Sequence, residues 1–164
     1  QVVAETVGNL DIRDTKYTEY KLTSVSNLRL GNVFDDKFEI GELDRLEASD
    51  SKYTEYEVGK LGKAFDLKQS FDDAVQVGQV AADFNLIHMD GKYSNMELAI
   101  ANDASFEFVV DMKYGKVNYP KSRVNNLKHE AKNEQLSIMG NVGHQQASNN
   151  SLKITGFDNT LEWK

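Results

Sequence analysis

Two pairs of adjacent aspartates come closest, by residue type and spacing, to a catalytic or metal-binding arrangement. Asp35-Asp36 follows Phe34, and Asp72-Asp73 follows Phe71. Paired carboxylates can bind calcium, which takes about six to eight oxygen ligands, and two carboxyl groups can also flank and hydrolyse a glycosidic bond. The surrounding residues lack the regular Asp, Asn and Gly spacing of a calcium loop, and aspartate favours tight turns. We therefore expect solvated turn residues, with calcium binding and polysaccharide cleavage as alternatives.

The remaining polar motifs point away from catalysis. His88, His129 and His144 have no partner at the spacing of a metal or catalytic motif. The chain has no cysteine, which excludes disulfides and thiolate zinc sites. Nucleophile elbows, phosphate loops and dinucleotide fingerprints are also missing from the sequence. We expect no metal, no cofactor and no catalytic site; the alternative location for one is an irregular segment with Arg123, His129 and Glu130.

Four tyrosines, Tyr17, Tyr53, Tyr93 and Tyr114, recur just before alternating apolar segments. If they are exposed, they form an aromatic ladder that can stack on sugar rings. If they are buried, they cap the core at a corner of each repeat, and burial is the favoured interpretation because apolar and aromatic side chains at repeat positions usually belong to the shared core. These four tyrosines are the candidate ligand-binding residues.

The tyrosines belong to a repeat, and repeats decide the fold. Tyr17-Thr18-Glu19-Tyr20-Lys21-Leu22 returns 36 residues later as Tyr53-Thr54-Glu55-Tyr56-Glu57-Val58, with a weaker copy, Lys37-Phe38-Glu39-Ile40, halfway between. Later copies end at Val77, Leu98 and Tyr119, so that the steps are 18 to 21 residues. A second alternating segment recurs with nearly the same period: Leu10-Asp11-Ile12, Leu28-Arg29-Leu30, Leu46-Glu47-Ala48, Phe65-Asp66-Leu67, Phe84-Asn85-Leu86 and Phe106-Glu107-Phe108.

Both segments have the period of two that indicates short half-buried strands. A unit of this length cannot bury its own apolar face, whereas stacked copies share one core. The sequence therefore predicts an all-β parallel solenoid with inward stacks from two positions of the first strand: Tyr20, Phe38, Tyr56, Val75, Met96 and Val117, and Leu22, Ile40, Val58, Val77, Leu98 and Tyr119. An antiparallel β-sandwich or meander is the alternative, since it also has short, regularly spaced strands.

Glycine and proline mark where the geometry changes. Gly41, Gly59 and Gly78 follow the first strand of their repeats and predict a corner with unusual backbone angles. Pro120 is the only proline and ends the clear repeats, which span 7–120. We expect a single domain over 1–164, with degenerate coils in 121–164 and a loop or a bulged strand in 121–135.

Charge and composition restrict the partners. The net charge of −7 argues against general binding to nucleic acid, since phosphate contacts need an excess of Lys and Arg. No apolar run approaches the length of a membrane-spanning helix. The chain opens Gln1-Val2-Val3-Ala4, which leaves room for a signal peptide that has been removed.

The repeat resembles the adhesin-like β-solenoid domains of bacterial cell envelopes, including the head-GIN adhesin type. The resemblance rests on the stretches 51–59 (Ser-Lys-Tyr-Thr-Glu-Tyr-Glu-Val-Gly), 91–98 (Gly-Lys-Tyr-Ser-Asn-Met-Glu-Leu) and 152–159 (Leu-Lys-Ile-Thr-Gly-Phe-Asp-Asn). It implies a right-handed parallel β-helix, export, and a place in the periplasm, at the outer membrane or on the cell surface. It lends no catalytic residues.

We therefore expect a non-catalytic envelope module, an adhesin or scaffold that binds glycan or protein through an exposed sheet face. The alternative is a polysaccharide-acting enzyme on a β-helix scaffold.

Overall fold

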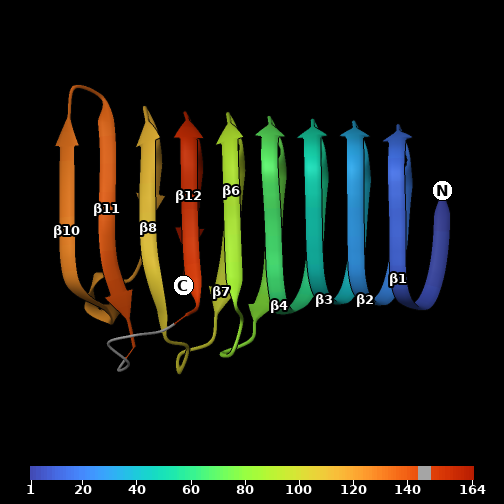
Figure 1. Cartoon of the computed structure of the whole chain (residues 1–164), viewed down its shortest axis with the longest axis horizontal. Helices are drawn as coiled ribbons and strands as arrows, with labels where there is room; N and C mark the ends of the chain where they lie inside the picture. Colours follow the sequence, from blue (N-terminus) through green and yellow to red (C-terminus); the bar gives the residue numbers. More distant parts are fainter. Residues whose placement is uncertain (144–148) are drawn as a thin grey trace.

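A computed structural model describes residues 1–143 and 149–164, which form a stack of β-coils (Figure 1). The described residues contain no α-helix and one short 3₁₀ helix, Lys121–Arg123. None of their helices is long and apolar enough to cross a bilayer. The strands are β1 (Val2–Lys16), β2 (Glu19–Phe34), β3 (Lys37–Lys52), β4 (Glu55–Phe71), β5 (Ala74–Val80), β6 (Leu86–Lys92), β7 (Asn95–Ile100), β8 (Phe106–Lys113), β9 (Lys116–Asn118), β10 (Val124–Lys132), β11 (Gln135–Val142), β12 (Ser151–Phe157) and β13 (Thr160–Trp163).

The first strands stack in sequence order and pair in parallel, which confirms the solenoid. Strands β1 to β4 each make most of one coil, bent at a corner near its middle, and β5–β6 continue the stack. Leu10 pairs with Leu28, and Leu28 pairs with Leu46. Tyr20 and Leu28 lie in the same strand, so the antiparallel pairing that a meander requires between their segments is not formed.

The core lies inside the coils, enclosed by the sheet that bends around them, as the period-two pattern predicts. All the predicted inward residues of the first strand are buried except Val117, which is half-buried near the end of the stack. The rings of Tyr20, Phe38 and Tyr56 stack nearly parallel, with centroids 4.6 and 5.4 Å apart. Side chains at equivalent positions of successive coils therefore touch. Together they form one continuous hydrophobic core, which a single coil is too small to form alone.

The predictions for two strands were out of register. In Phe106-Glu107-Phe108 it is Phe108, and not Phe106, that lies in line with Phe65, through Leu152 and Ile87. Phe84-Asn85-Leu86 aligns with Phe65-Asp66-Leu67 by pattern, but Phe65 pairs with Ile87 and Leu67 with Met89. Residues 81–85 instead form a turn in which the Phe84 amide donates to the Ala81 carbonyl. Phe84 is still fully buried. The longer repeat thus comes from extra residues at the corner, and these displace the strand start.

The corner glycines are needed for a different reason from the one predicted. Gly41, Gly59 and Gly78 do not have positive φ angles. A Cβ on Gly41 would lie 2.6 Å from the Thr23 carbonyl oxygen, and one on Gly59 would lie 2.5 Å from the Gly41 oxygen. Glycine is required here because stacked coils approach closely, backbone to backbone.

Residues 124–142 do not continue the coils, which corrects part of the expectation for 121–164, whereas residues 151–163 do form a further parallel coil. β10 and β11 form an antiparallel hairpin against β8 at the end of the sheet, with a bulge between Asn125 and Lys128. The strands β12 and β13, here called the C-terminal arc, return into the stack, where Figure 1 shows β12 between β6 and β8. β12 pairs in parallel with both β6 and β8, and β13 pairs with β7 and β9. The last residues of the chain therefore form an inner rung.

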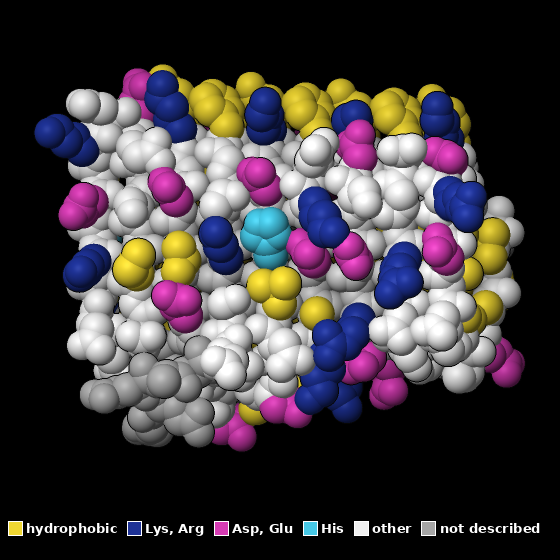
Figure 2. Space-filling view, viewed as in Figure 1, with side chains coloured by type: hydrophobic (Ala, Val, Ile, Leu, Met, Phe, Trp, Pro, Cys, Tyr) yellow, Lys and Arg dark blue, Asp and Glu magenta, His cyan; other side chains and the backbone are white. Residues whose placement is uncertain are grey.

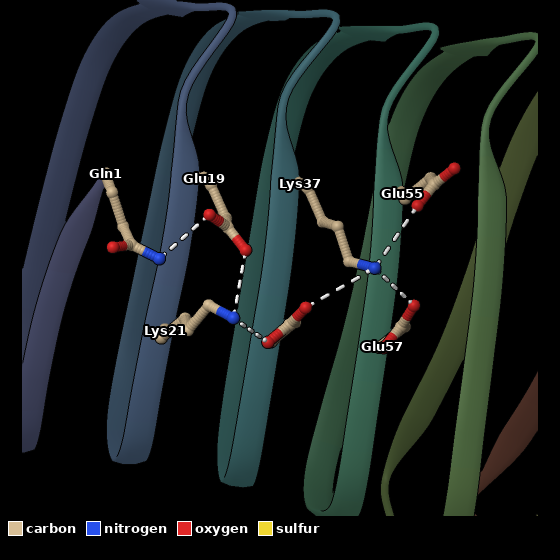
Figure 3. A network of polar contacts seen from close by, with 7 residues as sticks. Gln1, Glu19, Lys21, Lys37, Glu55 and Glu57 are labelled. Carbon is tan, nitrogen blue, oxygen red and sulfur yellow. Dashed lines mark hydrogen bonds and ion pairs between the residues drawn. The ribbon is translucent and has the colours of Figure 1, made fainter.

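The outer face of the first strands has a ladder of charged side chains (Figure 3). Lys21 contacts Glu19 and Glu39, and Lys37 contacts Glu39, Glu55 and Glu57 at 2.8 to 3.6 Å. The strand register places Glu39 directly beside Glu57 on the adjacent strand, and the repulsion between their like charges is unfavourable by itself. Lys37 lies between the two carboxylates and offsets this repulsion.

Candidate functional site: an aromatic ridge

The turn that follows the second strand of each coil contains one residue in the left-handed conformation. These residues alternate along the stack between tyrosine and aspartate, with φ angles of 51° to 60°: Tyr17, Asp35, Tyr53, Asp72, Tyr93, Asp158 and Tyr114. A positive φ reverses the direction of the chain over very few residues. It also interrupts the in-out alternation of the strand, so that the residue at this position points outward.

Seven aromatic rings form a continuous row along this edge of the molecule, which we call the aromatic ridge. Each ring makes an edge-to-face contact with the next, with centroids 5.3 to 5.8 Å apart and interplanar angles of 70° to 83°. In stack order the rings are Tyr17, Phe34, Tyr53, Phe71, Tyr93, Phe157 and Tyr114.

The favoured interpretation of the four tyrosines as core residues was wrong. Tyr17 is 73% exposed, and Tyr53, Tyr93 and Tyr114 are 44% to 45% exposed. The phenylalanines between them are half-buried. Figure 2 shows the resulting band of hydrophobic side chains along one edge, with lysines among them. An apolar row of this length on a protein surface commonly marks an interaction site.

Charged residues complete the ridge in a regular pattern. Strand pairing places Lys16, Phe34 and Lys52 side by side, and then Phe71, Lys92, Phe157 and Lys113. The next position along each chain alternates between tyrosine and aspartate. Each Phe is therefore followed by an exposed Asp, and each exposed Lys is followed by a Tyr, so aromatic and charged side chains alternate in both directions.

The paired aspartates are divided between the surface and the interior. Asp35 and Asp72 are exposed on the ridge, whereas Asp36 and Asp73 are 3% and 1% exposed beneath it. Asp36 accepts the Thr18 amide at 2.6 Å and the Phe34 amide at 3.1 Å. These bonds satisfy backbone donors that the sharp turn would otherwise leave unpaired in the interior.

The same arrangement recurs two coils on. Asp73 accepts the Thr54 amide at 2.8 Å and the Ser70 hydroxyl at 2.7 Å. Burial raises the pKa of Asp73 to about 6, although these hydrogen bonds favour the carboxylate and oppose the shift. Asp73, the second aspartate of this pair, is therefore a structural hydrogen-bond acceptor, and burying its carboxylate is energetically unfavourable.

The C-terminal arc supplies a third copy with an amide in place of the carboxylate. The Asn159 side-chain oxygen accepts the Ser94 amide at 3.0 Å, and its nitrogen donates to the Gly91 carbonyl at 2.8 Å. The resulting buried polar row beneath the ridge comprises Thr18, Asp36, Thr54, Asp73, Ser94 and Asn159.

The other candidate residues do not come together. His88 contacts Asp66 at 2.7 Å on the outer face of the sheet, far from the ridge in the coil. Arg123 donates to the carbonyls of Ile100 and Ala101 and lies over the Trp163 ring. His129 and Glu130 lie further along β10 and are exposed. His144 lies outside the described residues.

The described residues also contain no group of three or more metal-ligating side chains. Asp36 and Asp73 are already engaged as hydrogen-bond acceptors, so neither pair presents two free carboxylates at one point.

Sequence reasoning missed the contribution of Phe34, Phe71 and Phe157 to the ridge. A signal was available. Lys-Tyr-Thr or Lys-Tyr-Ser alternates with Phe-Asp-Asp along the first five turns, but Tyr93 and Tyr114 follow each other with no Phe-Asp motif between them. The unused motif is Phe157-Asp158-Asn159, and the structure places it in that gap.

No family model, no curated protein and no solved structure matches the chain. Arguments about function therefore rest on the ridge itself.

Proposed function

We propose that the protein is a non-catalytic binding module that holds an extended partner along the aromatic ridge. The observation that carries this proposal is the unbroken row of seven rings, four of them tyrosines with 44% to 73% of their surface exposed. A solenoid spreads its surface over equivalent coils, which suits a long partner better than a compact one.

Backbone conformation supports the same proposal. The left-handed region is favourable for glycine and tolerable for Asn and Asp, but it is unusual for a bulky residue such as Tyr53. Glycine would relieve this strain and would remove the ring. Strained residues that persist are concentrated at functional sites, so tyrosine at four such positions favours a role for the rings at the surface.

The placement of the protein in a bacterial envelope, as an adhesin or scaffold, is part of the proposal and rests on the resemblance of its repeats. The polysaccharide-cleaving alternative is less well supported, because Asp36 and Asp73 are buried in hydrogen bonds beneath the ridge.

A binding screen tests this proposal. The wild-type chain would be applied to glycan and peptide arrays beside a Tyr53→Ser/Tyr93→Ser double variant and a Met139→Ser control, which removes an exposed apolar side chain of β11 away from the ridge. We expect the double variant to lose the wild-type signals and the control to keep them. Signals that persist in a folded double variant would show that the ridge is not the binding site.

A further inference from the structure

The four tyrosines of the ridge are evenly spaced along the stack, although not along the sequence. One Phe-Asp turn lies between each tyrosine and the next in stack order. With strands about 4.8 Å apart, successive tyrosines are about 9.6 Å apart and the four span about 29 Å. The last interval equals the others only because the C-terminal arc inserts Phe157 between Tyr93 and Tyr114.

The rings are also held in place before any partner binds. Tyr53 and Tyr93 each contact a phenylalanine on both sides, at 5.5 to 5.6 Å. A partner would therefore order few side chains on binding, which lowers the cost of association. A rigid, periodic row of rings fits a straight polymer whose apolar surface returns with the same period.

The charged residues define what the partner carries between its apolar surfaces. The exposed aspartates Asp35, Asp72 and Asp158 lie between successive tyrosines and accept hydrogen bonds, whereas the exposed lysines beside the tyrosines donate them. A notch between Tyr17 and Tyr53 is lined by Asp35 and also by Glu19, Glu55 and Lys37, whose ammonium group contacts Glu55. The partner therefore needs both donors and acceptors along its whole length.

From this geometry we infer that the ridge binds a linear β-1,4-linked glycan, with every second sugar ring stacked on a tyrosine. The inference rests on the proposed function and specifies its ligand. A pyranose ring has one flat C–H face and hydroxyl groups around its edge. In an extended β-1,4-linked chain alternate sugars present the same face, and the disaccharide repeat is close to the spacing of the tyrosines. Chains with α-1,4 linkages coil and chains with β-1,3 linkages curve, so their sugar rings do not stay aligned with successive tyrosines.

Peptides fit less well. An extended β-strand returns to the same face after about 6.7 Å, which is out of step with the tyrosines. A polyproline II helix repeats after about 9.3 Å and does dock on aromatic surfaces. Proline has no N–H group, however, so Asp35, Asp72 and Asp158 would lose water without gaining a donor.

The test is calorimetric titration of the full chain with β-1,4-linked oligosaccharides of glucose and of N-acetylglucosamine, from two to eight sugars. Each added disaccharide should improve affinity about two- to tenfold, the range for one aromatic contact. The improvement should end at seven sugars, which reach all four tyrosines. The two sugar series distinguish a cellulose-like from a chitin-like ligand.

Variants at the ends of the ridge make the test specific. In Tyr17→Ser or Tyr114→Ser, an oligosaccharide of seven sugars should bind no more tightly than one of five sugars. An oligosaccharide of three sugars should bind these variants with the same affinity as it binds the wild type. Tyr53→Ser should weaken all chains of five or more sugars, and Tyr53→Phe and Met139→Ser should keep most of the affinity. Folding of each variant is checked by circular dichroism.

Several outcomes would overturn the inference. Equal affinity for α-1,4-linked, β-1,3-linked and β-1,4-linked chains, or affinity that does not depend on chain length, would refute register with the tyrosines. Binding of a twelve-residue polyproline peptide, lost in Tyr53→Ser, together with no binding of β-1,4-linked chains would leave the ridge as a binding site and replace its ligand. Failure of every probe, glycan and peptide alike, would count against the proposed function itself.

Discussion

The coils of β1 to β4 and the C-terminal arc make the same ridge by different routes. In the first coils the buried bond beneath the ridge joins residues 18 apart, from the Thr18 amide to Asp36. In the arc the equivalent bond joins residues 65 apart, from the Ser94 amide to Asn159. The hydrogen bonds of the buried row are thus the same along the stack, although the rungs do not follow one another in sequence order. A rung of a solenoid is defined by its neighbours in space, whichever part of the sequence supplies it.

This comparison has a consequence for folding. Contacts between the first coils are local, so those coils can form in sequence order from the N-terminus. Strands β6 and β8 meet only through β12, which belongs to the last residues of the chain. The end of the solenoid therefore closes only after the C-terminal arc is in place.

The largest expected effect on stability comes from comparing a core residue with a ridge residue of the same strand. Phe65 is fully buried, whereas Phe71 of the same strand is half-buried on the ridge. Phe65→Ala should lower the free energy of unfolding by about 3–5 kcal/mol, and Phe71→Ala should lower it by clearly less. Chemical denaturation measures both. Equal costs would mean that the ridge is as important to stability as the core, and would weaken the case for a binding role.

The next prediction compares the regions directly. Leu46 and Leu152 are both fully buried on the same sheet, and each change to Ala should cost about 2–5 kcal/mol. Because a solenoid couples mainly neighbouring units, amide hydrogen exchange should rise in different places. Leu152→Ala should deprotect β8 and β11 and leave β2 unaffected, whereas Leu46→Ala should deprotect β2 to β4. A uniform rise in exchange in both variants would show that the stack unfolds as one unit.

A third prediction concerns the buried carboxylate. The pKa of Asp73 is raised from 3.8 to about 6, so the folded state binds this proton more tightly than the unfolded state. Its contribution to stability is therefore full below pH 3.8 and is lost as pH rises to about 6, a change on the order of 2–3 kcal/mol. Asp73→Asn should remove this slope in unfolding measured between pH 4 and 7.

The arc supplies the matched control. Asn159→Asp would place a carboxylate against the carbonyls of Gly91 and Thr155, which now accept its amide protons. This variant should lose about 1–3 kcal/mol or more near neutral pH, and should recover part of that loss as the new carboxyl group is protonated at low pH. A slope that persists in Asp73→Asn would assign the pH dependence to another group.

The smallest expected effect is on the surface ladder. Lys37 contacts three glutamates but lies at the surface, so Lys37→Gln should lower the free energy of unfolding only slightly, and by less than any of the changes above. The loss should shrink with added salt, because salt screens exposed charges. Thermal unfolding at low and high sodium chloride measures this. A loss that does not depend on salt would mean that Lys37 acts through packing of its aliphatic chain.

Much of the fold was readable from the sequence because its determinants are local. The period-two pattern of Tyr20-Lys21-Leu22 and its copies specifies strands and their inward faces, and the repeat specifies what each coil stacks on. The same local reasoning failed at Phe84-Asn85-Leu86, where extra corner residues displaced the strand. It failed again at the tyrosines, since a left-handed residue interrupts the in-out alternation on which the prediction of burial depended.

By itself, then, the sequence determined a stacked all-β repeat and the inward residues of its strands in the first coils, because strand periodicity and shared burial act over a few residues. Only the tertiary structure decided that Tyr17, Tyr53, Tyr93 and Tyr114 face outward, that Asp35 and Asp36 point to opposite sides, and that Phe157 lies between Tyr93 and Tyr114. A strand accepts any partner with compatible side chains and free backbone groups. The order of rungs therefore depends on which segments meet in space, which no local pattern records.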